Sequence, residues 1–151
     1  MYQRIMVPID GSATAERGLQ EAITLASRLK STLCLLHISS DFPIMGGAAD
    51  AVDPGSCRNG LHQFGVELLA KAKATAQARD VQAETVLSDL RGGRVSEAIV
   101  REAQAANCRL IVIGTHGRRG LRRAGLGSDA EAVARTSAVP VLLVRDPAMP
   151  G

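Results

Sequence analysis

A glycine-rich segment from Gly114 to Ser128 carries the residues best suited to hold a ligand. Because glycine lacks a Cβ atom, the backbone N–H groups of such a segment can approach an anion without obstruction. The segment ends in Gly127 and Ser128, which lead into an expected helix, and the N-terminal end of a helix dipole favours phosphate. These features predict phosphate binding. The alternative is a structural turn that only needs left-handed backbone conformations.

Positive charge is concentrated in the same segment, although the formal net charge of the whole chain is only +3. Such a cluster would attract an anionic ligand. The alternative is a solvated arginine face, and we expect only one or two of the side chains to contact phosphate. The cluster consists of Arg118, Arg119, Arg122 and Arg123.

The turn from Pro8 to Ser12, which follows a short apolar run, is the second segment whose residues could bind a ligand. The Asp10 carboxylate can accept hydrogen bonds from ribose hydroxyls, and aliphatic side chains can enclose a purine. Asp before Gly is also a common turn former, which is the alternative role for Asp10. His116 is a candidate general base or proton-sensitive contact, and its alternative role is a loop histidine with backbone partners.

Apolar runs alternate with amphipathic segments along the chain and must position these residues. This alternation predicts a single α/β domain over residues 1–151. We expect an open, five-stranded parallel sheet in the order 3-2-1-4-5 with helices on both faces. The segment Ser39–Asn59 lacks periodicity and is predicted to be a mobile loop, centred on residues 40–58. The strands are expected at residues 4–9, 32–38, 81–87, 109–114 and 139–144, and the helices at residues 12–30, 61–79, 95–106 and 128–136.

Sheet topology predicts where a ligand binds. In open parallel sheets, ligands bind beyond the carboxyl ends of the strands, at the point where strand order reverses. For the predicted order, this point lies between the first and fourth strands. The turn from Pro8 to Ser12 leaves the first strand, and Gly114 begins the loop that leaves the fourth. We therefore expect the two candidate segments to converge on one crevice.

The glycine spacing Gly-x2-Gly-x9-Gly-Ser resembles the ATP-binding signature of the universal stress protein family. Segments 7–12, 36–38 and 139–144 are similar to the family's opening strand and turn, the end of its second strand, and its closing strand. The resemblance covers nearly the whole chain and implies a Rossmann-like fold. The residues that match the signature are Gly114, Gly117, Gly127 and Ser128.

The resemblance also implies a role for each part of the site. Asp10 would meet the ribose, and Pro8, Ile9 and the backbone of Ile38 would hold the adenine. The glycines of the signature and Ser128 would hold the phosphates. The implied nucleotide-binding set is completed by Thr115, His116, Arg118 and Asp129.

Asp129 departs from the family pattern, in which a small or aliphatic residue is more usual at this position. An acidic residue in the first turn of a helix favours the helix dipole. Beside a triphosphate it is a like charge unless Mg²⁺ lies between them. Asp129 therefore weakens ATP binding or selects another ligand, such as AMP or cyclic AMP.

Three functions from different classes agree with these residues. The first is a nucleotide-dependent regulatory protein of the stress response that acts through an unidentified protein partner. The second is an enzyme with slow ATP hydrolysis or self-phosphorylation on Ser128 or Thr115. The sequence lacks a P-loop lysine motif and a Gly-x-Ser-x-Gly elbow, so we assign no catalytic residues and no metal ligands. The third is an interaction module that has lost its ligand, for which Asp129 is the hint.

The composition limits where the protein is expected to be located and which partners it is expected to bind. No apolar run approaches the roughly 20 residues of a membrane span, and the first residues lack a secretory pattern, so we expect a cytoplasmic protein without a membrane partner. The aromatic content of 2% argues against nucleic acid. The cysteines Cys34, Cys57 and Cys108 are expected to be reduced, with Cys34 and Cys108 in the core. The edge strand Val139–Val144 predicts a homodimer.

Overall fold

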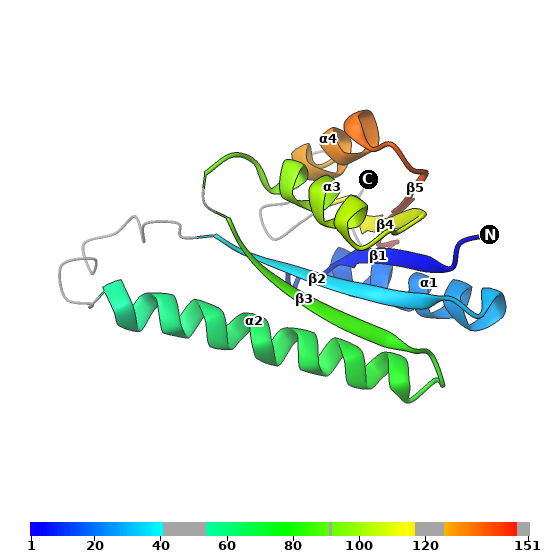
Figure 1. Cartoon of the computed structure of the whole chain (residues 1–151), viewed down its shortest axis with the longest axis horizontal. Coiled ribbons are helices and arrows are strands. Elements are labelled where there is room, and N and C mark those ends of the chain that lie inside the picture. Colours follow the sequence, from blue (N-terminus) through cyan, green and yellow to red (C-terminus); the bar gives the residue numbers. More distant parts are fainter. Residues whose placement is uncertain (41–53, 91, 117–125, 148–151) are drawn as a thin grey trace.

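A computed structural model of the chain describes residues 1–40, 54–90, 92–116 and 126–147. Strands and helices alternate along these residues (Figure 1). The strands are β1 (Arg4–Pro8), β2 (Thr32–Ser40), β3 (Ala83–Leu90), β4 (Leu110–Gly114) and β5 (Val141–Val144). The helices are α1 (Ala13–Leu29), α2 (Pro54–Gln77), α3 (Val95–Ala105) and α4 (Ser128–Thr136).

The five strands form one parallel sheet in the order β3-β2-β1-β4-β5, which confirms the predicted topology. The central strand β1 pairs with β2 on one side and with β4 on the other, and Ile5 faces Leu33 and Leu110. β5 lies at the edge beside β4.

Both faces of the sheet are covered, because successive side chains of the central strands point to opposite faces. Ile5 and Val7 belong to the apolar cluster that includes residues of α1 and α2. Met6 belongs to a second cluster that includes residues of α3 and α4. Figure 1 shows α3 and α4 together on one side of the sheet. This double burial explains why the central strands are almost continuously apolar.

Ser12 caps α1, as predicted. Its side chain accepts a hydrogen bond from the backbone N–H of Ala15 at 3.1 Å, which satisfies one of the unpaired donors at a helix start. The helix ends at Leu29, and the residue that caps it, Lys30, has a left-handed φ of 58°.

Several boundaries differ from the predicted ones. α2 begins at Pro54, so the last part of the predicted loop Ser39–Asn59 is helical, and β2 extends through Ser40. Proline suits the first turn of a helix because its φ is fixed and its missing N–H is not needed there. Val81 donates its N–H to Ala76 at the end of α2, so β3 starts two residues later than expected. Residues 41–53 lie outside the described residues.

The helices within the described parts of the chain do not include one that is both long enough and apolar enough to span a membrane.

Candidate functional site

The carboxyl ends of β1 and β4 lie side by side, as the pairing of Met6 with Ile111 requires. Gly114 ends β4, and its backbone packs against the start of α1. A Cβ atom on Gly114 would lie 2.6 Å from the carbonyl oxygen of Thr14, a distance that real Cβ atoms do not tolerate. The turn after β1 and the start of the glycine-rich segment therefore lie together, as the sequence predicted.

The turn after β1 is held by its own side chains. The Asp10 Oδ1 atom accepts a hydrogen bond from the Ser12 N–H at 2.9 Å, and Gly11 adopts a left-handed φ of 86°. Asp10 thus has the turn-forming role that the sequence left open. A carboxylate has about four acceptor positions, so this bond is compatible with a ligand role as well.

An aromatic wall beside this turn was missed by the sequence analysis. The buried His37 ring donates its Nδ1–H to the Ile9 carbonyl at 2.7 Å. Phe64 of α2 meets this ring edge to face, with centroids 5.8 Å apart. A Cβ atom on Gly11 would lie 3.5 Å from Phe64 Cζ, so the ring lies directly against the turn.

Gly65 explains how α2 reaches this position. A Cβ atom on Gly65 would lie 2.7 Å from His37 Cδ2 and 2.8 Å from Leu87 Cδ1. Only glycine permits this approach of the helix to β2 and β3. The one signal in the sequence was a glycine inside a helical pattern, which indicates close packing but does not reveal the partner.

The adenine-site candidates occupy different environments. Pro8 pairs with Leu36 at the end of β1, and the Ile9 N–H donates to the Leu36 carbonyl at 2.7 Å. Ile9 is buried, whereas Pro8 is half-buried. Ile38 lies near the end of β2, and its side chain packs on the α3–α4 face of the sheet. The role predicted for Ile38 concerns its backbone alone.

The described ends of the glycine-rich segment are joined. The Gly127 N–H donates to the Thr115 carbonyl at 2.6 Å, and a Cβ atom on Gly127 would lie 2.7 Å from the same oxygen. The start of α4 is therefore held against the end of β4. Ser128 and Asp129 occupy the exposed first turn of this helix.

Thr115 and His116 interact with each other. The Thr115 hydroxyl lies 3.0 Å from His116 Nδ1, and the Thr115 backbone N–H donates to the Val144 carbonyl at 2.9 Å. Thr115 is buried. Its burial makes it a poor acceptor for a phosphoryl group, in contrast to the exposed Ser128.

Gly117, Arg118 and the other arginines of the cluster lie outside the described residues. Within the described ranges, no group of three or more His, Cys, Asp or Glu residues is arranged to hold a metal ion.

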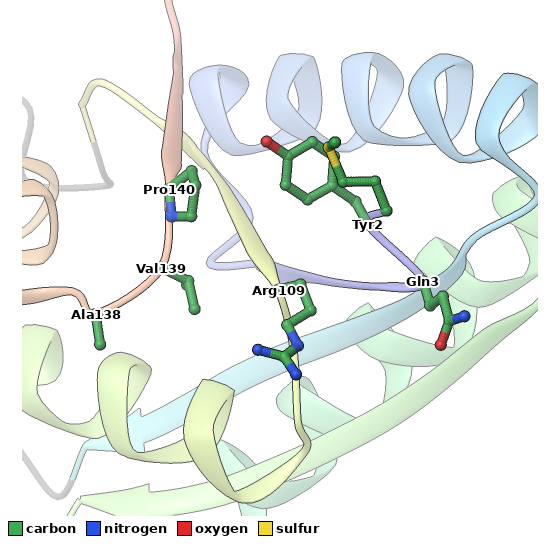
Figure 2. Close-up of a pocket in the computed structure, with 7 residues that line it drawn as sticks. Tyr2, Gln3, Arg109, Ala138, Val139 and Pro140 are labelled. Atoms are coloured by element: carbon green, nitrogen blue, oxygen red, sulfur yellow. The ribbon is translucent and has the colours of Figure 1, made fainter.

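A separate open hollow of about 600 Å³ lies at the other end of the sheet (Figure 2). Its walls precede β1, β4 and β5, so it is remote from the predicted ligand segments. The hollow is lined by Met1, Tyr2, Gln3, Arg109, Ala138, Val139 and Pro140.

The chain is similar to known proteins over most of its length. The model of the universal stress protein family matches residues 1–145. Universal stress protein YxiE from Bacillus subtilis is 30% identical, with 96% of this chain and 100% of that protein covered. Universal stress protein MJ0531 from Methanocaldococcus jannaschii is 31% identical, with 97% of this chain and 84% of that protein covered.

Solved structures agree with these matches. The structure of MJ0577 superimposes with a TM-score of 0.84 at 25% identity and covers 98% of this chain and 99% of that one. A universal stress protein from Archaeoglobus fulgidus in complex with dAMP has a TM-score of 0.65 at 25% identity, with 95% and 98% covered.

Proposed function

This chain belongs to the universal stress protein family, and on that premise we propose that it binds ATP or a related adenine nucleotide where β1 and β4 end. The observation that carries the proposal is the close packing of Gly114 on Thr14 and of Gly127 on Thr115. These two contacts hold three parts of the site together: the start of α1, the end of β4 and the start of α4. The dAMP complex of the Archaeoglobus relative supports an adenine nucleotide as the ligand.

The proposed roles follow from position and chemistry. Asp10 receives the ribose hydroxyls, and Pro8, Ile9 and the backbone of Ile38 enclose the adenine. Phe64 adds an apolar surface at the same turn. The phosphates lie over the start of α4, where Ser128 donates its hydroxyl and the helix dipole favours negative charge. Gly114, Gly117, Thr115, His116 and Arg118 complete the phosphate side, and Mg²⁺ accompanies a triphosphate.

Titration calorimetry on nucleotide-free protein tests the proposal with ATP, AMP and cyclic AMP. A hydrogen bond to a charged group contributes about 1.5–3 kcal/mol, so Ser128→Ala is expected to weaken binding at least about tenfold. Thr136→Ala, at the other end of α4, is the matched control and should bind normally. Folded protein that binds none of the three nucleotides would overturn the proposal.

We also propose a regulatory role in the cytoplasm, in which nucleotide binding changes a surface recognised by a protein partner. A homodimer through β5 is part of this proposal. Leu142 and Leu143 of this edge strand are 41% and 37% exposed, and an exposed apolar edge favours pairing. Light scattering at micromolar concentration should give a dimer that Leu142→Lys disrupts and Leu61→Lys, on exposed α2 surface, does not. A monomeric wild-type protein would refute the dimer but not nucleotide binding.

A further inference from the structure

Thr115 and His116, which directly follow β4, form a side-chain pair beside the proposed phosphate position. The Thr115 hydroxyl lies 3.0 Å from His116 Nδ1, which is a hydrogen-bond distance. Thr115 is only 6% exposed, whereas His116 is half-buried. Thr115 is therefore shielded from a bound ligand, and His116 can be reached by one.

The backbone of Thr115 is held on two sides. Its N–H donates to the Val144 carbonyl at 2.9 Å, and its carbonyl accepts from the Gly127 N–H at 2.6 Å. The β-branched side chain of threonine also has few rotamers. The Thr115 hydroxyl is thus a fixed point that can orient the His116 ring.

The direction of the hydrogen bond follows from the burial of Thr115. Among the described residues, His116 Nδ1 is the only hydrogen-bond partner of this hydroxyl. If Nδ1 carried the imidazole hydrogen and donated it, the hydrogen of the buried hydroxyl would be left without an acceptor, which is costly. If the hydroxyl donates instead, both groups are satisfied. The neutral His116 ring therefore carries its hydrogen on Nε2, and Nε2 is the ring nitrogen that remains for a ligand.

His37 shows the opposite arrangement and provides an internal comparison. Its Nδ1 lies 2.7 Å from the Ile9 carbonyl, and a carbonyl can only accept a hydrogen bond. The neutral His37 ring therefore carries its hydrogen on Nδ1. Two of the 3 histidines of the chain thus have opposite tautomers.

His116 lies at the place where α4 begins. A Cβ atom on Gly127, the residue that caps α4, would lie 3.3 Å from His116 Cα. Glycine supplies no side chain to cap the first N–H groups of the helix, and such a helix start favours a phosphate. An N–H donor on His116 would act together with the Ser128 hydroxyl at the same helix start.

We propose that His116 donates its Nε2–H to a phosphate oxygen of the bound nucleotide, and that Thr115 is the positioning residue that holds the ring in this tautomer. Both roles rest on the proposed nucleotide site. Thr115 is too buried to touch the phosphate and acts through His116. Because only a phosphate oxygen uses this donor, the pair favours adenine nucleotides over the nucleoside adenosine.

Heteronuclear NMR of the imidazole nitrogens tests the tautomers in full-length protein without any nucleotide. Spectra are recorded at about pH 8.5, about two units above the ordinary histidine pKa of about 6.5. We expect the hydrogen on Nε2 in His116 and on Nδ1 in His37. Thr115→Val should give a mixture of tautomers in His116 and leave His37 unchanged. A hydrogen on Nδ1 of His116 in the wild type would overturn the proposal, and an unchanged pattern in Thr115→Val would overturn the role of Thr115.

Titration calorimetry with AMP and adenosine at the same pH tests the phosphate contact. His116→Ala should weaken AMP binding at least about tenfold and leave adenosine binding unchanged. Thr115→Val reduces the population of the binding-competent ring and should weaken AMP binding roughly two- to tenfold. Thr115→Ser restores the hydroxyl and should bind like the wild type. Thr136→Val is the matched control, because the Thr136 hydroxyl donates to the Ala132 carbonyl at the far end of α4.

Binding by the wild-type protein separates the role of His116 from nucleotide binding itself. If the wild type binds AMP and His116→Ala binds it equally well, or if this variant loses AMP and adenosine to the same extent, His116 does not contact the phosphate although the nucleotide site stands. A folded wild type that binds no nucleotide refutes both. The wild-type tautomers are measured even if a variant does not fold, and the Nδ1–H form of His116 would overturn the proposal by itself.

Discussion

The backbone of Gly114, at the end of β4, lies so close to Thr14, in the first turn of α1, that a Cβ atom on residue 114 would be 2.6 Å from the Thr14 carbonyl oxygen. The crowded atoms belong to the backbone of β4 and to that of α1. Neither can move without moving its strand or helix. The contact fixes the distance between the turn after β1 and the glycine-rich segment, and with it the width of the proposed crevice.

Gly114→Ala should therefore lower both stability and nucleotide affinity. Forcing an extra carbon into such a contact costs about 1–3 kcal/mol, which urea unfolding will measure, and the displaced strand end should weaken binding in calorimetry. Gly18→Ala is the control, because Gly18 lies in α1 and also faces the backbone of Gly114. A Cβ atom there would lie 3.4 Å from the Gly114 nitrogen, so its effect should be much smaller. Equal losses for the two variants would contradict the importance of the Gly114 contact.

Two glycines in α2 should respond to the same substitution with opposite signs. Gly65→Ala would bring a carbon within 2.7 Å of the His37 ring and should destabilise the protein by about 1–3 kcal/mol. A Cβ atom on Gly60 meets no atom within 4 Å, so Gly60→Ala should stabilise the helix by up to about 1 kcal/mol. Urea midpoints of both variants test the pair. A stable Gly65→Ala variant would show that α2 can move away from β2 without cost.

The predictable part of the fold is the part encoded by local patterns. The apolar runs of the central strands and the Ser12 cap indicated strand order and the start of α1, because burial on both faces and capping leave direct traces in sequence. The start of α2 left no such trace. Pro54, Gly55 and Gly60 lie in its first turns, and such residues are more typical of turns.

The candidate site was also predictable only in part. The glycine spacing marked the segment at the end of β4, since close backbone approaches can be made only by glycine. The contact of Phe64 with His37 depends on how α2 docks on the sheet, and the contact of Arg4 with Cys34 depends on which strands are neighbours. Neither contact is visible in the local sequence, because its partners come from separate elements.

The ion pair between Arg4 and Glu84 predicts a specific dependence of stability on acid. The hydrogen bond from Arg4, and then its charge, lower the pKa of the Glu84 carboxyl below its ordinary value of 4.5. The unfolded chain therefore binds this proton first as pH falls, so the contribution of Glu84 to stability is complete above about pH 4.5 and is lost below it. Urea midpoints from pH 7 to pH 3 should show wild type and Glu84→Gln converging at the acid end. A gap that stays constant over this range would contradict the assignment.

Asp129 provides a test of which nucleotide the site prefers. Its position in the exposed first turn of α4 places its charge near the proposed phosphate position, where a like charge at about 4 Å opposes a phosphate by roughly 1 kcal/mol in water. Asp129→Asn should therefore raise ATP affinity about fivefold without Mg²⁺, and raise AMP affinity less because AMP carries less charge. Added Mg²⁺ or salt should reduce the difference by screening it.

Glu131→Gln is the matched control, because it removes the same charge from the same helical turn. Glu131 is paired with Arg135 at 2.6 Å along the outside of α4, so its charge is already compensated and its removal should change ATP affinity little. If both variants improve ATP binding equally, the effect comes from the net charge of the helix and not from a carboxylate at the phosphates. If Asp129→Asn leaves ATP affinity unchanged, the triphosphate does not reach the start of α4, and a monophosphate is the better ligand for this site.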